Sequence, residues 1–362
     1  MQTKSHKRFV VIALFTIGVF IFIPRILVNE NFVLADTKTP PTATVKVELG
    51  LMLPTFPTGR PPEVAEVELG RELFSDPLLS RDGTISCASC HDPEHGFADA
   101  NAVSVGINGA KGRRNSPTLW NVAYLEQLSW DGRHKSLEDQ ALEAIYNPTE
   151  MGLNRELLKN LVETKYGARL LKIYGEIAAE GVAKAIGSFQ RTLVAANSPL
   201  DQYLYAGKSD AISESAKRGL RLFLGDGRCV QCHTMRCEDC HPFGGVTATF
   251  TDDRFHNIGV GFSEKGNNGD LGRSEISGLA EDRGAFRTPT LRNIELTAPY
   301  MHDGSMKTLE EVVDHYDKGG NPNSNLDPDV QRLDLNDQEK RDLVEFLKTL
   351  TSDKLRNSRR RQ

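Results

Sequence analysis

The sequence has no cysteine available for a disulfide framework. Its 362 residues contain 6 cysteines, and all of them lie in three copies of the spacing Cys-x-x-Cys-His. It also lacks an excess of basic charge, because 44 Lys and Arg against 49 Asp and Glu leave a formal net charge of -5. A nucleic-acid-binding protein normally carries a basic face. The composition therefore argues against nucleic acid as a partner and directs attention to the cysteine motifs.

Long apolar runs are missing except at the start of the chain. Residues 9–23 are apolar, Gly or Thr without interruption, and they follow a basic segment and precede Pro24. A run of this length is short for a membrane-spanning helix. It is typical of a secretory signal with cleavage after Ala35. An uncleaved N-terminal anchor is the alternative, because Ala35 lies far from the run, and in both cases we expect the rest of the chain to be exported.

Alternating patterns typical of long strands are also absent, and the sequence favours a mostly α fold. We predict helices over residues 157–174 and 182–194 and a further helix capped by Ser213. Asn336 is followed three residues later by Glu339, which is the spacing of a helix capping box. A last helix is therefore predicted to begin after Asn336.

The cysteine motifs carry the most specific chemical signal. Two cysteines that flank two residues can add to the vinyl groups of haem, and the adjacent His can bind the iron. The first two motifs consist of Cys87, Cys90 and His91, and of Cys229, Cys232 and His233. Zinc binding and thiol redox chemistry are the alternatives. A His after every pair, together with export, disfavours both of them.

The third motif follows the second after only three residues. It consists of Cys237, Cys240 and His241. We predict that it attaches a third haem. A four-thiolate metal or cluster site built with Cys229 and Cys232 is one alternative. An insertion whose motif is never loaded with haem is the other.

An internal repeat divides the body of the chain. Residues 116–138 and 288–310 align without a gap, and 9 of the 23 positions are identical. Trp130 and His302 occupy the same position of this repeat. A Gly-x-x-Leu-Phe segment also precedes each of the first two cysteine motifs. Such self-similarity indicates duplicated structural units, so we predict two tandem haem domains related by internal duplication.

These features predict the organisation of the whole chain. In order, we expect a signal peptide or anchor at 1–35, a Thr- and Pro-rich linker at 36–62, an N-terminal haem domain at 63–205, a C-terminal haem domain at 206–355, and a basic tail at 356–362.

Five segments carry a family resemblance. They are residues 70–80, 85–92, 114–118, 130–133 and 298–304. Together they resemble the bacterial dihaem cytochrome c peroxidase and MauG superfamily over about residues 60–352. The resemblance implies two cytochrome c-like helical domains, haem c groups that face the seam between them, and a periplasmic location.

Two positions relate the sequence to the MauG-like branch. Ile107 stands where the peroxidase branch has a removable distal His, so the resemblance implies an open face on the iron bound by His91. Tyr316, fourteen residues after His302, stands where peroxidases have a Met ligand and MauG has a Tyr ligand. Tyr316 is thus the expected second ligand of the His233 haem. A buried helix tyrosine is the alternative, and the ligand would then be Met301, Met306 or His315.

The resemblance also assigns roles in a reaction with peroxide. Glu150 matches a distal glutamate that moves a proton, and Gln140 matches a distal glutamine that donates to the bound oxygen. Trp130 matches a tryptophan that relays electrons between the haems, with a packed core ring as the alternative. Arg287 and Arg292 are candidates to pair with haem propionates, with solvated side chains as the alternative.

A calcium site is implied in the same way. Asn115 and the carbonyls of Thr297 and Pro299 match the positions at which the family holds calcium between its haems. Oxygen ligands suit this hard cation.

The sequence is therefore interpreted as that of an exported multihaem c-type peroxidase, an oxidoreductase that reduces hydrogen peroxide at the His91 haem. Electrons would come through Trp130 and the His233 haem from a small cytochrome or other redox protein, or from an oxidisable partner protein. A membrane would be involved only through the N-terminal anchor. An electron-transfer cytochrome without peroxide chemistry is the alternative, but such a carrier normally closes both axial positions of its haem. A haem-free metal-binding protein is a second alternative.

Overall fold

The computed structural model describes residues 45, 48–235, 249–263, 266–267 and 269–359. The predicted signal or anchor and the third cysteine motif, with Cys237, Cys240 and His241, lie outside this range. Among the described residues, none of the helices combines the length and hydropathy that crossing a membrane requires.

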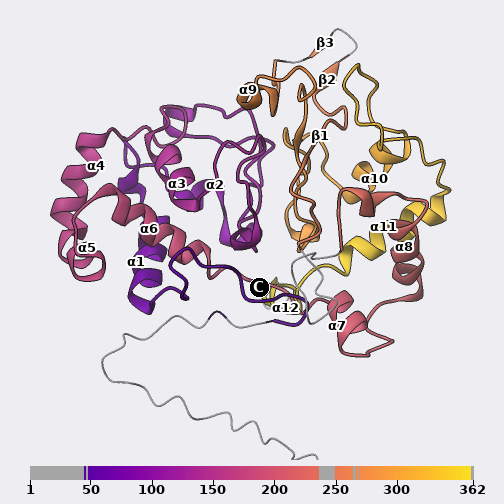
Figure 1. The fold of residues 1–362 in the computed structure, drawn as a ribbon, viewed down its shortest axis with the longest axis horizontal. Helices are drawn as coiled ribbons and strands as arrows, with labels where there is room; N and C mark the ends of the chain where they lie inside the picture. The colour runs from indigo at the N-terminus through magenta and orange to yellow at the C-terminus, as the bar shows by residue number, and fades with distance from the viewer. Residues whose placement is uncertain (1–44, 46–47, 236–248, 264–265, 268, 360–362) are drawn as a thin grey trace, which may run out of the picture. The chain divides into compact units, whose positions relative to one another are not determined.

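Helices dominate the described part of the chain, as predicted (Figure 1). The α-helices are α1 (Val64–Ser75), α2 (Cys87–Cys90), α3 (Leu137–Tyr146), α4 (Arg155–Leu161), α5 (Gly167–Tyr174), α6 (Ala179–Gln190), α7 (Pro199–Tyr205), α8 (Glu214–Leu224), α9 (Ser274–Ser277), α10 (Leu309–Asp317), α11 (Asp337–Lys348) and α12 (Asp353–Arg359). Short 3-10 helices are η1 (Pro77–Leu79), η2 (Pro93–His95), η3 (Ile107–Gly109), η4 (Val122–Tyr124), η6 (Cys229–Gln231) and η7 (Ile294–Leu296).

The strands are all two residues long. They form two antiparallel pairs, β1 (Phe255–His256) with β4 (Phe286–Arg287), and β2 (Phe262–Ser263) with β3 (Gly266–Asn267). Pairs this short contribute little stability by themselves. The described fold therefore depends on helix packing and on loop contacts.

The predicted helix caps at Asn336 and Ser213 are confirmed, whereas the helix predicted over 182–194 is α6, which spans Ala179–Gln190. The side chain of Asn336 accepts hydrogen bonds from the backbone of Gln338 and Glu339, and Glu339 completes the capping box of α11. Ser213 caps α8 in the same way, by accepting from the backbone N–H of Ala216. The helix predicted over 157–174 is more complex, because a π-helical turn, η5 (Val162–Tyr166), separates α4 from α5.

Two hydrophobic cores hold the helices. The first is built mainly from α1, α3 and α6, and α1 and α3 both pack against α6. The second is built mainly from α8, α10 and α11. Leu200 of α7 belongs to the second core, whereas Leu355 of α12 packs against the first. The chain thus returns to its first core after completing the second.

The two cores use the same device to bring helices close together. A side-chain Cβ at Gly70 of α1 would lie 1.9 Å from the backbone oxygen of Ala185 in α6. A Cβ at Gly219 of α8 would likewise lie 1.9 Å from the backbone oxygen of Asp342 in α11. Any residue other than glycine would force each helix pair apart. This explains why both copies of the Gly-x-x-Leu-Phe segment begin with glycine.

The phenylalanines of the same segments make matching contacts. The ring centroids of Phe74 and Phe189 are 5.2 Å apart at an interplanar angle of 59°. Those of Phe223 and Phe346 are 5.0 Å apart at 53°. The equivalent glycine and phenylalanine contacts in both cores support the predicted duplication.

Candidate haem sites

The first cysteine motif folds as α2 and the residue that follows it. Ser86 and Ser89 form a capping box that starts this helix. The Nδ1 atom of His91 lies 3.1 Å from the backbone oxygen of Phe97. An N–H on Nδ1 can donate to this carbonyl, which leaves the lone pair of Nε2 for a metal. Burial lowers the pKa of His91 and so favours the neutral imidazole that metal binding requires.

The second motif has the same arrangement. Nδ1 of His233 lies 2.9 Å from the backbone oxygen of Phe250, and burial again lowers the pKa of the imidazole. Cys229 and Cys232 lie at the two ends of the turn that contains η6. In both motifs a hydrogen bond to a backbone carbonyl therefore fixes Nδ1 of the His, and Nε2 is left for an iron ion.

Each motif lines a cavity. We call the cavity lined by Cys87, Cys90 and His91 the first cavity, and the one lined by Cys229, Cys232 and His233 the second cavity. Apolar surface predominates in the second cavity, which suits a porphyrin. The cysteines, the oriented His side chains and the cavities together fit covalently attached haem.

The zinc alternative finds no support in the described part of the chain. Its one group of three candidate ligand side chains is Cys232, Asp252 and His256. This group contains a single cysteine and omits His233. Neither described Cys-x-x-Cys pair gathers the four ligands of a structural zinc site.

The predicted distal residues face the first cavity. Gln140 of α3 and Glu150, in the turn after α3, both line it together with His91. The amide nitrogen of Asn147 donates to Oε1 of Glu150 at 2.9 Å. Burial, followed by the nearby charge of Glu143, raises the pKa of Glu150 to about 7. The structure thus places a carboxyl group suited to exchanging protons at neutral pH in the first cavity.

Ile107 is not one of the described residues that line the first cavity. Its side chain is buried, and a Cβ at Gly152 would lie 2.4 Å from Ile107 Cδ1. The side chain at the position of the removable His is therefore packed against the turn that carries Glu150. Nothing on Ile107 could bind iron.

Trp130 lies between the cavities and lines both of them. Its indole Nε1 donates to the backbone oxygen of Asn115 at 2.8 Å, and its ring centroid lies 6.4 Å from that of His302 in an edge-on arrangement. Arg287 also lines both cavities, and its Nη1 lies 3.2 Å from Oδ1 of Asp253. Burial lowers the pKa of Arg287.

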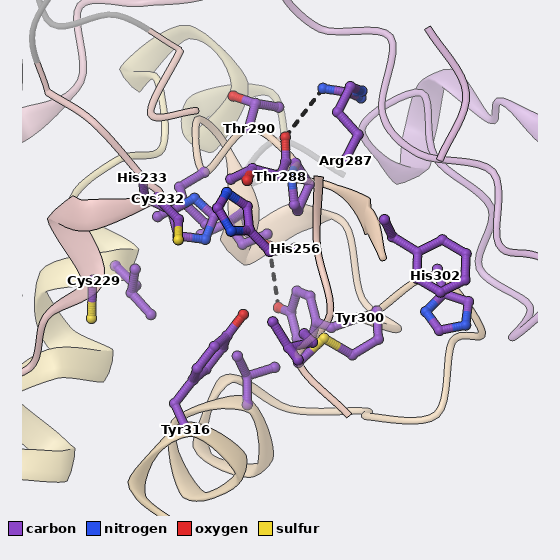
Figure 2. A pocket seen from close by; sticks show the side chains of 18 of the residues that line it. Cys229, Cys232, His233, His256, Arg287, Thr288, Thr290, Tyr300, His302 and Tyr316 are labelled. Atoms are coloured by element: carbon purple, nitrogen blue, oxygen red, sulfur yellow. Dashed lines mark hydrogen bonds between the residues drawn. The ribbon is translucent and has the colours of Figure 1, made fainter. Parts of the chain in front are cut away.

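Tyr316 points its hydroxyl group into the second cavity, toward the wall that carries Cys232 and His233 (Figure 2). It lies on α10, which Thr308 and Glu311 start with a capping box. Burial raises the pKa of its phenol.

Of the three alternative ligands for the second haem, only one lines the second cavity as Tyr316 does. Met301 lines the second cavity. Met306 instead packs against the second core, and Nε2 of His315 lies 2.9 Å from the backbone oxygen of Ile258. Neither of these two lines the second cavity. Met301 is therefore the one alternative to Tyr316 that the geometry favours.

The predicted calcium ligands belong to the wall of the second cavity. Asn115, Thr297 and Pro299 all line it. The amide nitrogen of Asn115 donates to the backbone oxygen of Asn101 at 2.8 Å, which orients the side-chain oxygen of Asn115. The oxygen chemistry fits a calcium ion.

The expectation for Arg292 is wrong. Its guanidinium is neither solvated nor part of the lining of the second cavity. Its Nη1 lies 2.9 Å from Oδ2 of Asp201, and its Nη2 donates to the backbone oxygen of Gly50 at 2.9 Å. The guanidinium predicted to pair with a haem propionate is thus paired with the buried carboxylate of Asp201.

Two further polar side chains were missed by sequence reasoning. His256 lines the second cavity, with Nδ1 2.6 Å from Asp327 and Nε2 3.0 Å from Asp252. The hydrogen bond with Asp252 is the largest cause that raises the pKa of His256 to about 11. Glu143 lines the first cavity beside Glu150. Its spacing from Gln140 on one helix face was a signal that could have revealed it.

The helical fold and its two haem-attachment sites define a c-type cytochrome with two described haem sites. The family model for di-haem cytochrome c peroxidases matches residues 64–210. Together with the relatives below, this match shows that the chain belongs to the di-haem cytochrome c peroxidase family, a class of oxidoreductases.

Relatives match most of the chain. The methylamine utilization protein MauG of Methylorubrum extorquens is 38% identical over 82% of this chain and 81% of its own length. The cytochrome c551 peroxidase of Nitrosomonas europaea is 36% identical over 81% and 82%. The crystal structure of a MauG-like protein associated with microbial copper homeostasis matches with a TM-score of 0.76 and 32% identity, over 87% of this chain and 97% of that one.

Proposed function

We propose that the protein is an exported, periplasmic c-type peroxidase that reduces hydrogen peroxide at the first haem site. The observation that carries the proposal is the composition of the first cavity. The carboxyl group of Glu150 and the amide of Gln140 line the same cavity as His91, whereas Ile107 supplies no ligand. A simple electron carrier has no need of an acid/base group in such a place.

The first cavity supplies the proton chemistry that the reaction needs. Reduction of one peroxide consumes two electrons and two protons and yields two waters. A bound haem would supply the iron that binds peroxide and passes electrons to it. Glu150 takes the proton from one peroxide oxygen and returns it to the other, which leaves as water. The amide of Gln140 donates a hydrogen bond that orients the bound oxygen without adding charge.

Electrons reach the first cavity from the second in this proposal. Trp130 lines both cavities, and its polarisable ring serves as the relay between them. Tyr316 would hold the iron of the second haem together with His233. The reductant is a small cytochrome or another redox protein, or a partner protein whose side chain becomes oxidised.

Two further cofactors belong to the proposal. Asn115 and the carbonyls of Thr297 and Pro299 would hold a calcium ion. A third haem is attached to the motif at 237–241. Its support is the sequence motif alone.

Replacing Glu150 with Gln tests the proposal. The variant keeps the shape of the side chain but cannot move a proton, so the reaction of the haem-loaded protein with peroxide should slow by about 100-fold or more. Stopped-flow absorbance of the haem bands measures this rate. A parent protein that transfers electrons but does not react with peroxide would instead identify an electron-transfer cytochrome. An unchanged rate in Glu150→Gln would exclude Glu150 from the reaction.

A further inference from the structure

A second carboxylate lies beside Glu150 in the first cavity. Glu143 of α3 and Glu150 both accept hydrogen bonds from the amide nitrogen of Asn147, at 3.1 Å and 2.9 Å. The amide oxygen of Asn147 accepts in turn from the backbone N–H and the hydroxyl of Thr149, at 3.0 and 2.9 Å. Asn147 is thereby fixed, and one nitrogen atom holds the two carboxyl groups close together.

Opposite charges act on Glu150 from the elements packed around it. Glu143 raises the pKa of Glu150, and Arg133, in the loop before α3, lowers it. The Nη2 atom of Arg133 lies 3.6 Å from Oε2 of Glu143, so it neutralises this carboxylate only in part. The thiols of Cys87 and Cys90 also lie near Glu150, and haem attachment would convert them into uncharged thioethers. Glu143 is then the negative group that faces Glu150.

We propose that Glu143 is a positioning residue for proton transfer, because its carboxyl group, held by the same Asn147 nitrogen as that of Glu150, favours the protonated form of Glu150. This inference rests on the proposed function of Glu150 and adds a residue to it. Two carboxyl groups at one site do not both ionise readily. Arg133 lies beside the carboxyl group of Glu143, whereas burial places the proton of the pair on Glu150. A proton carrier works best when its pKa lies near the working pH.

The direction of each change follows from these charges. Burial is the larger cause that raises the pKa of Glu150, and the charge of Glu143 is the next. Neutralising Glu143 removes only the second cause, so the pKa of Glu150 should fall but stay above that of an exposed glutamate. Removing Arg133 should raise the pKa of Glu150 further. The two substitutions therefore move the same titration in opposite directions.

Infrared spectroscopy of the haem-loaded full chain measures this titration without turnover. The C=O band of protonated Glu150 is identified as the band that Glu150→Gln lacks. In the parent protein it should disappear around pH 7. It should disappear at lower pH in Glu143→Gln and at higher pH in Arg133→Gln. Asp139→Asn is the matched control, because it removes an acidic side chain from an exposed position of the same helix.

The acid limb of the pH profile of kcat/KM for peroxide should shift in step with the band. The inference would be overturned if Glu143→Gln did not change the pH at which the band disappears. It would also be overturned if Asp139→Asn changed that pH by the same amount. Failure of the proposed function has a different signature. The band would then shift as expected, while Glu150→Gln would still react with peroxide at the parental rate.

Discussion

Replacing Arg292 with Met should destabilise the protein strongly. The Arg292 and Asp201 side chains are 1% and 0% exposed, and both guanidinium Nη atoms lie within 3.1 Å of the carboxylate oxygens. Met fills much of the same volume but removes the positive charge. Asp201 would then keep a negative charge in a place that water cannot reach. The protein must either protonate this carboxyl group or open the structure around it.

The expected loss of folding stability follows from the burial of this ion pair. Removing one partner of a buried ion pair costs about 3–5 kcal/mol, because the remaining charge loses its counter-ion. Arg332 and Asp334 form a matched control, since their side chains are 75% and 70% exposed. Arg332→Met should leave the stability nearly unchanged, because both of these side chains are exposed to water. The double variant Arg292→Met/Asp201→Asn should recover part of the loss, because it leaves no buried charge.

Urea unfolding of the haem-loaded protein, followed by far-ultraviolet circular dichroism, measures these differences. The comparison requires an unchanged dependence of the unfolding free energy on urea, so that midpoints report stability. If Arg292→Met lost no more stability than Arg332→Met, the buried carboxylate would not need its partner. The reasoning from burial would then be wrong at this site.

Two further predictions concern the haem sites. Tyr316→Phe removes the hydroxyl group from the second cavity, so the second haem should change from a low-spin to a high-spin absorption spectrum while peroxide still reacts at the first site; an unchanged spectrum would point to Met301. The intact mass of the purified protein should correspond to three attached haems, because each of the three motifs is complete in sequence. A mass with two haems, and with Cys237 and Cys240 open to alkylation, would refute the third.

Sequence reasoning succeeded where the determining contacts are local. Asn336 and Glu339 lie three residues apart, so the capping box that starts α11 could be seen directly. The His of each cysteine motif is adjacent to its second cysteine, and in the two described motifs the structure fixes one ring nitrogen and leaves the other for a metal. Residues without such local signals, such as Glu150, gained a role only through the family resemblance.

Contacts between distant segments were beyond sequence reasoning. Arg292 and Asp201 are 91 positions apart, and the sequence around either residue does not indicate that they pair. His256 and Asp327 are 71 positions apart in the same way. Hydrophobic periodicity shows which face of a helix is buried, but it does not say which charged groups meet across the fold. These pairings follow from tertiary packing alone.

The contact between Trp130 and His302 joins two residues that occupy the same position in the two repeats. It therefore resembles the contact on the two-fold axis of a homodimer, where a residue meets its own copy. In a homodimer every substitution occurs on both sides of the axis at once. Within a single chain the two sides can change separately. Here one side carries the indole of Trp130 and the other the imidazole of His302. The contact is therefore asymmetric, although the two residues occupy equivalent positions of the repeat.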